Sequence, residues 1–182
     1  MADITIPGKT IALLLTDGVE QPELTEPLAA VQEAGGTPQI VSPKEKSLQA
    51  MKGDWEHADH FDVDVQLKDA DPSDYDALVL PGGTLNADSM RIDETAQKFV
   101  KAFFDAGKPV AAICHGPWIL TEIDEVKGRR VTSYQALKTD LENAGAEWVD
   151  ESAVVSDGLV TSRNPNDLED FNRAFLALVA ES

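Results

Sequence analysis

The feature of this sequence that most restricts its fold is a set of three short apolar runs, each followed closely by a glycine. The runs cover residues 11–15, 77–80 and 110–113, and they contain no polar residue. A strand without polar alternation is typical of a sheet that is covered on both faces. We therefore expect the three runs to be central strands of a mostly parallel sheet.

Segments with helical spacing of apolar residues separate these strands. Helices are expected around residues 24–31, 99–104, 117–123, 137–144 and 168–179, and further strands at 39–42 and 131–133. Residues 44–74 are polar and irregular, and the alternation at 61–65 indicates a small hairpin or an edge strand. Strands alternating with helices predict one α/β domain over residues 1–182, with helices on both faces of the sheet.

Composition argues against several functional classes. The 15 Lys and Arg against 33 Asp and Glu give a net charge of −18, which repels nucleic acid and anionic membrane surfaces. No apolar run approaches the roughly 20 residues that cross a bilayer, and the first residues lack the pattern of a signal peptide. A single cysteine forms no internal disulfide. We expect a cytoplasmic protein that binds neither nucleic acid nor membranes.

The single cysteine lies at the sharpest predicted turn. Cys114 follows the run 110–113 in the order small-x-Cys-x-Gly, with Ala112 and Gly116 as the small residues, which is the pattern of a nucleophile elbow. Such a turn places the side chain at the start of a helix, where free N–H groups and the helix dipole favour an anion. We expect a nucleophile with a lowered pKa, and the alternative is a small buried hydrophobic residue.

Three loops are expected at the carboxyl edge of the sheet, where ligands bind in open α/β folds, and Cys114 lies in one of them. Gly82 and Gly83 allow a ligand to approach the backbone, so the N–H groups of Gly83 and His115 are candidates for an oxyanion hole. His115 is either a general base oriented by a carboxylate such as Asp88, or a packing residue. Glu20 is either a site residue or a charge that only stabilises a helix start.

Metal binding is the weaker interpretation of the remaining histidines. His57 and His60 could supply two zinc ligands, but the sequence offers no further Cys or His cluster to complete such a site. A solvated loop explains them better. We expect no metal and no cofactor.

Four motifs resemble one known family along nearly the whole chain. They are Leu80-Pro81-Gly82-Gly83, Ala111-Ala112-Ile113-Cys114-His115-Gly116-Pro117, Gly128-Arg129-Arg130-Val131-Thr132-Ser133-Tyr134 and Asn143-Ala144-Gly145-Ala146-Glu147-Trp148-Val149-Asp150. In this order and spacing they are similar to the PfpI intracellular protease and parkinsonism-associated deglycase superfamily, nearer its PfpI-like branch. The resemblance implies a flavodoxin-like three-layer sandwich related to the class I glutamine amidotransferase domain.

The resemblance also implies roles for particular residues. Cys114 would be the nucleophile, and Glu20, in the first loop, would be the carboxylic acid that shares a proton with its sulfur. His115 would form a triad with Asp88 of a neighbouring copy, so the site would be complete only in a homodimer or higher oligomer. Tyr134 stands where another branch of the superfamily carries a histidine, and we expect it to line the substrate site with Gly82 and Gly83.

Three functions remain open at this point. The first, favoured by the resemblance, is a cysteine hydrolase that removes glyoxal or methylglyoxal adducts from amines and thiols, or converts the free aldehydes to hydroxy acids during stress. The second is an intracellular peptidase that uses Cys114, His115 and Asp88 as a triad. The third is a non-enzymatic stress protein, either a redox sensor or a chaperone, in which Cys114 is oxidised to a sulfinate.

Overall fold

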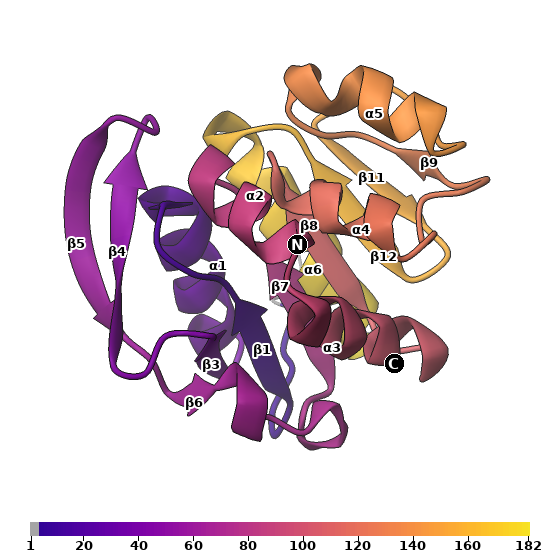
Figure 1. The fold of residues 1–182 in the computed structure, drawn as a ribbon. Coiled ribbons are helices and arrows are strands. Elements are labelled where there is room, and N and C mark those ends of the chain that lie inside the picture. Colours follow the sequence, from indigo (N-terminus) through magenta and orange to yellow (C-terminus); the bar gives the residue numbers. More distant parts are fainter. Residues whose placement is uncertain (1–3) are drawn as a thin grey trace.

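A seven-stranded sheet forms the centre of the computed structural model, which describes residues 4–182 (Figure 1). Its strands are β1 (Thr10–Leu14), β3 (Thr37–Ser42), β6 (Val65–Gln66), β7 (Ala77–Leu80), β8 (Val110–Ile113), β11 (Ala153–Ser156) and β12 (Leu159–Ser162). They are ordered β11-β12-β8-β7-β1-β3-β6, and all neighbours are parallel except β11 and β12. The predicted α/β class with a mostly parallel central sheet is confirmed.

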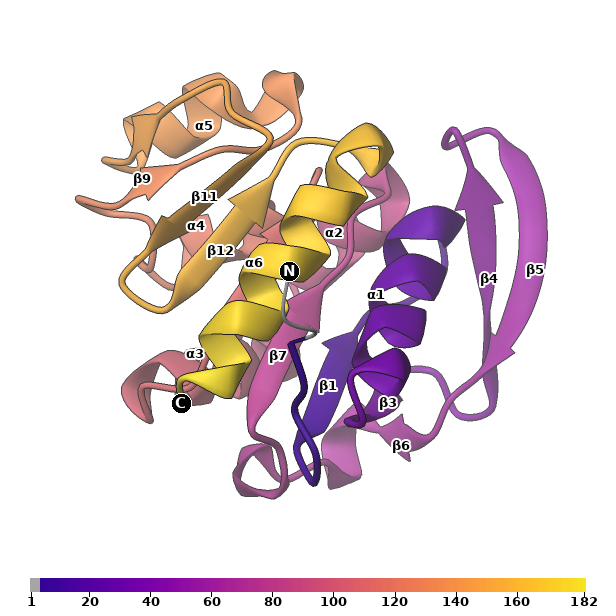
Figure 2. The same ribbon diagram turned by 180° about the vertical axis from the view of Figure 1, so that it is seen from behind.

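Helices cover both faces of this sheet. Those in residues 4–182 are α1 (Gln21–Glu33), α2 (Thr84–Arg91), α3 (Glu94–Asp105), α4 (Ile119–Glu122), α5 (Lys138–Asn143) and α6 (Leu168–Ala180). Helices α1 and α6 lie side by side on one face, which Figure 2 shows from the front, and α2 to α5 contribute to the other. The predicted three-layer arrangement is therefore present.

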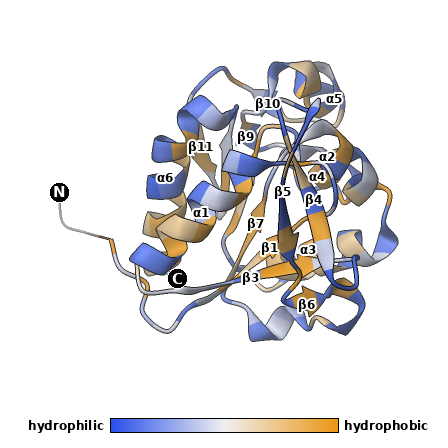
Figure 3. Ribbon diagram, turned by 90° about the vertical axis from the view of Figure 1, so that its left-hand side faces the viewer, coloured by the Kyte–Doolittle hydropathy of each residue, from blue (hydrophilic) through white to orange (hydrophobic). Residues whose placement is uncertain are grey.

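The alternation of side chains along β1 divides the core in two. Ile11 and Leu13 point towards α1 and α6, and Ala12 and Leu14 point towards the layer that contains α3. Because both sets are buried, the strand is apolar throughout, and Figure 3 shows the central strands as hydrophobic between more hydrophilic helices. This explains why the three apolar runs predict the sheet so directly.

Two small sheets flank the main one. The first contains β2 (Val19–Glu20), β4 (Ser47–Lys52) and β5 (Glu56–Asp62), and the second pairs β9 (Arg130–Val131) with β10 (Glu147–Trp148). The hairpin expected in the irregular region 44–74 is confirmed as β4 and β5. Parallel pairing of β4 with β2 holds this hairpin beside the start of α1.

Helix α2 is not predicted by the sequence pattern. Its buried residues are Asn86, Ala87 and Met90, so its inner face is too polar and too short to show a helical apolar repeat.

The order of the strands creates a crevice at one edge of the sheet. The chain runs from β1 to β3 on one side of β1 and later crosses to β7 on the other side. The loops after β1 and β7 therefore diverge and leave a crevice at the carboxyl edge of the sheet. No helix within residues 4–182 is long and apolar enough to cross a membrane.

Candidate active site

Cys114 occupies a strained turn directly after β8. Its φ of 62° lies in the left-handed region, which non-glycine residues rarely adopt. Two residues later, a Cβ on Gly116 would lie only 2.2 Å from the carbonyl oxygen of Leu80, so the turn requires glycine there. Cys114 itself is 7% exposed, at the crevice. The predicted nucleophile elbow is thus confirmed as a backbone geometry.

The carboxyl group beside the sulfur belongs to Glu23. This side chain is fully buried in the first turn of α1 and lies beside the Cys114 thiol, with which it interacts electrostatically. Its Oε2 accepts the Gly82 N–H at 2.8 Å. Its Oε1 is buried and has no hydrogen-bond partner among the described residues. A proton on this oxygen would have the nearby sulfur as its acceptor.

Glu20 does not take this place, and the role that the resemblance implies for it is wrong. It lies in β2, before the helix, and its half-buried carboxylate accepts the N–H of Gly53 at 2.9 and 3.1 Å. Glu23 follows three residues later, in the first turn of α1, where its side chain is fully buried. The segment Val19-Glu20-Gln21-Pro22-Glu23-Leu24 contains both carboxylates, and only the start of α1 decides between them.

Burial governs the protonation of Glu23 and Cys114. It raises the pKa of Glu23 to about 8, and the nearby charges of Glu20 and Asp54 act in the same direction. Burial also raises the pKa of the Cys114 thiol, as does the charge of Glu23, and the N–H groups of Gly83 and His115 oppose this change. The expected lowering of this pKa is wrong because burial and the charge of Glu23 outweigh the N–H groups, and the helix after Cys114 is short: a single 3-10 turn precedes α4, which has only four residues.

His115 contacts the sulfur despite being its neighbour in sequence. Its Nδ1 lies 3.3 Å from the Cys114 Sγ, and its ring stacks on Tyr134 at a centroid distance of 4.7 Å and an angle of 26°. Burial lowers the pKa of His115, so the imidazole is neutral at neutral pH and able to accept a proton. The structure therefore brings together Cys114, His115, Glu23 and the N–H of Gly83.

Asp88 lies apart from these groups within one chain. It is exposed on α2 and has no hydrogen bond to His115. Its proposed contribution across a subunit interface stays a prediction. A residue of the same helix that sequence reasoning misses is Asn86, whose side chain binds the Thr16 N–H and the carbonyls of Pro81 and Gly82. This buried amide fixes the glycine loop under the sulfur.

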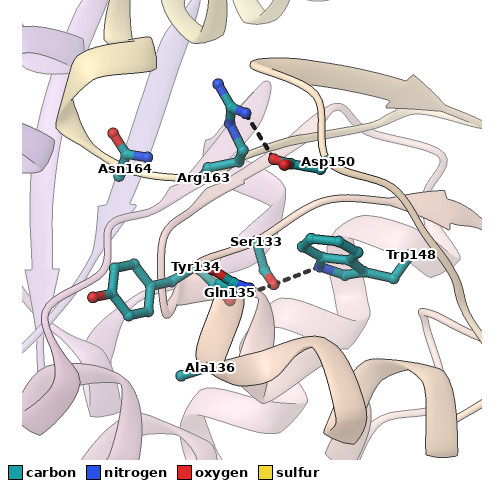
Figure 4. Close-up of a pocket in the computed structure, with 8 residues that line it drawn as sticks. All are labelled: Ser133, Tyr134, Gln135, Ala136, Trp148, Asp150, Arg163 and Asn164. Carbon is teal, nitrogen blue, oxygen red and sulfur yellow. Dashed lines mark hydrogen bonds and ion pairs between the residues drawn. The ribbon is translucent and has the colours of Figure 1, made fainter.

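Two cavities meet at Tyr134. The first has a volume of about 300 Å³ and is lined by Glu20, Glu23, Gly53, Asp54, Trp55, Gly83, Cys114, His115, Tyr134 and Pro165. The second has about 460 Å³, and Figure 4 shows Arg163 paired with Asp150 across it. The smaller cavity is the candidate reaction site, because it alone of the two is lined by Cys114. No group of three potential metal-ligating side chains occurs among residues 4–182.

Comparisons with known proteins identify a family model, similar sequences and similar structures. A model of the DJ-1/PfpI family matches residues 9–178. YraA of Bacillus subtilis, provisionally named a cysteine protease, is 43% identical over 172 residues, covering 94% of this chain and 99% of that protein. Deglycase TK1284 of Thermococcus kodakarensis is 40% identical over 169 residues, covering 93% and 98%. A ThiJ/PfpI domain protein from Brachyspira murdochii has a TM-score of 0.88 at 22% identity, covering 97% and 99%.

Proposed function

Since this chain belongs to the DJ-1/PfpI family, we propose that it is a cysteine hydrolase with Cys114 as nucleophile, acting on carbonyl adducts of amines. The observation that carries the proposal is one buried thiol that lies 3.3 Å from the imidazole of His115 and beside the buried carboxyl group of Glu23. A neutral base can remove the thiol proton, and a carboxylic acid can protonate the leaving amine. The name of the deglycase relative supports this substrate class.

The reaction on a methylglyoxal adduct begins at the carbon that bears the amine. His115 takes the thiol proton as the C–S bond forms, the C–N bond breaks, and the amine leaves with the proton of Glu23. Through an enediol, the C–H proton of this carbon then moves to the adjacent ketone carbon and its hydroxyl proton moves to the ketone oxygen. The first carbon is thereby oxidised and the second reduced without an external oxidant. The N–H groups of Gly83 and His115, which approach the sulfur, would hold the negative oxygen that forms.

Water completes the cycle. It cleaves the resulting thioester to a 2-hydroxy acid and the free thiol, and the imidazolium of His115 returns its proton to Glu23. Every proton is thereby restored. The same groups would cleave a peptide bond if the sulfur attacked an amide carbonyl, and the 3.3 Å contact between Cys114 and His115 favours this second candidate.

The redox-sensing alternative is less well supported. Oxidation to a sulfenate or sulfinate starts from the thiolate, and burial raises the pKa of Cys114. A low thiolate fraction makes the thiol a poor sensor of dilute peroxide. The hydrolase mechanism does not need a preformed thiolate, because His115 removes the proton of the Cys114 thiol as the sulfur attacks.

Turnover assays separate the two enzymatic candidates. The wild-type protein and Cys114→Ala are incubated with a methylglyoxal-modified peptide and with the same peptide unmodified, and products are identified by mass. We expect the wild type to release the amine and a 2-hydroxy acid from the modified peptide only. Cleavage of the unmodified peptide would instead favour the peptidase, and full turnover by Cys114→Ala would refute both.

A further inference from the structure

On the side of its ring away from the sulfur, His115 faces a series of hydrogen-bonded polar groups. Its Nε2 lies 3.5 Å from the Oγ1 of Thr84, at the start of α2. The Thr84 hydroxyl donates to Oδ2 of Asp54 at 2.7 Å, and the Thr84 N–H donates to Oδ1 of the same carboxylate at 2.8 Å. Both oxygens of Asp54 are therefore directed at one threonine.

The hydrogen bonds that link His115, Thr84 and Asp54 can run in only one direction. An ionised carboxylate is an acceptor only, so the single proton of the Thr84 hydroxyl is used by Asp54. A lone pair of Oγ1 then faces Nε2 of His115, which must carry the ring proton. The lone pair of Nδ1 is left for the thiol of Cys114. The contact thus selects the tautomer that a general base needs.

The hairpin between β4 and β5 carries Asp54 to this place. Asp54 has a φ of 63° at the hairpin tip and lies 30 residues before Thr84 in the sequence. The preceding residue, Gly53, donates its N–H to the carboxylate of Glu20, which anchors the tip at the mouth of the cavity. Glu20 therefore acts on the site by holding the hairpin.

We propose that Asp54 and Thr84 are positioning residues that complete a Cys114–His115–Thr84–Asp54 relay within a single chain. This inference rests on the proposed function and deepens it, since it assigns the carboxylate that orients the base. When the thiol proton passes from Sγ to Nδ1, the imidazolium is stabilised by Asp54 through the hydroxyl of Thr84. The relay needs no carboxylate from a second subunit, and so it does not require Asp88.

The charges around the imidazole agree with this assignment. The titratable groups that face it are Asp54 from the hairpin, Glu20 from β2, Glu23 from α1, Cys114, and Tyr134 stacked on its ring. Among them, Asp54 favours the charged imidazole, and burial opposes that form. The 3.5 Å contact is long for a hydrogen bond, and the inference requires it to shorten as the imidazolium forms.

The test measures thiol reactivity and needs no substrate. Because Cys114 is the chain's single cysteine, the rate of alkylation by iodoacetamide reports the reactivity of this one thiol, and it is followed by intact mass from pH 5 to 10. The variants are Asp54→Asn and Thr84→Val, with Thr84→Ser as the conservative rescue. Glu56→Gln, an exposed carboxylate on the same hairpin, is the matched control.

We expect Asp54→Asn and Thr84→Val to slow alkylation at pH 7 by about tenfold, and Thr84→Ser and Glu56→Gln to stay within about twofold. Thr84→Val keeps the backbone N–H that binds Asp54, so the hairpin stays anchored when only the hydroxyl is lost. Nitrogen-15 shifts of the His115 ring should show Nε2 protonated in the wild type and a mixture of tautomers in Thr84→Val.

Two results would overturn the relay. One is that Asp54→Asn and Thr84→Val both keep the wild-type pH profile of alkylation and the wild-type tautomer of His115. The other is a profile that moves in Asp88→Asn and not in Asp54→Asn, which would assign the carboxylate to a partner. If alkylation depends on Asp54 but the wild type processes none of the carbonyl adducts or peptides, the relay stands and the proposed function fails.

Discussion

Glu23 and Cys114 flank Gly82 so closely that no side chain fits between them. A Cβ on Gly82 would lie 2.4 Å from Oε2 of Glu23 and 2.7 Å from Cβ of Cys114. The buried carboxyl group of Glu23 and the Cys114 side chain are thus held close by the absence of a side chain on Gly82. This relationship ties the glycine loop after β7 to the chemistry at the end of β8.

Gly82→Ala should therefore separate the acid from the thiol. We expect turnover to fall at least tenfold and the free energy of unfolding to drop by about 1–3 kcal/mol, as for other overpacked sites. Urea denaturation and initial rates measure the two effects. Ser89→Ala, at an exposed position of α2, is the control and should change neither. Wild-type rates in Gly82→Ala would mean that the contact is not needed for catalysis.

Glu23→Gln and Glu20→Gln distinguish the two carboxylates of the first loop. Loss of the proton donor in Glu23→Gln should lower kcat by about 10²-fold or more. Glu20→Gln keeps an oxygen that can accept the Gly53 N–H, so its kcat should stay within about fivefold. Steady-state kinetics on the same substrate measure both. The reverse order of effects would return the acid role to Glu20.

The raised pKa of Glu23 predicts a pH-dependent stability. The carboxyl titrates near its usual value of 4.5 in the unfolded chain and at about 8 in the folded protein. Between these values the unfolded chain loses a proton that the folded protein keeps, so the free energy of unfolding falls as pH rises. The accumulated loss is on the order of a few kcal/mol.

Urea unfolding of the wild type and Glu23→Gln from pH 4 to 9 measures this dependence. The variant has no group to titrate at this position, so its stability relative to the wild type should increase from pH 4.5 to pH 8. A difference between the two proteins that is constant with pH would show that Glu23 titrates normally.

Tyr134 should matter through its ring and not through its hydroxyl. It stacks on His115, and its own side chain is 44% exposed. Tyr134→Phe keeps the stacked ring and should retain activity within about twofold, and Tyr134→Ala should lower kcat about tenfold by releasing the imidazole. Equal losses in the two variants would instead assign the effect to the hydroxyl.

The strands and the elbow were predictable because each depends on local sequence. The runs 11–15, 77–80 and 110–113 are apolar on both faces, and Cys114 is followed two residues later by a glycine. The hairpin was predictable only as a region, since its exposed strand β5 carries polar residues on both sides. Parallel pairing with β2, which fixes its place, is a long-range contact.

The acid and the relay could not be read from the sequence for a physical reason. A glutamate in the first turn of a helix is common as an exposed charge, and nothing local indicates that Glu23 is fully buried. Asp54 lies in the least regular part of the chain, and its contact with Thr84 exists only because the hairpin folds over the crevice. Both residues become visible once the three loops are placed together.

The most direct test of the account is trapping of a covalent intermediate on Cys114. Wild-type protein and Cys114→Ala are mixed with a methylglyoxal-modified peptide, quenched in acid within the first turnovers, and analysed by intact mass spectrometry and peptide mapping. The account predicts a three-carbon acyl adduct on Cys114 in the wild type, with release of the unmodified peptide, and neither in Cys114→Ala. Release of the peptide by Cys114→Ala at the wild-type rate would contradict it.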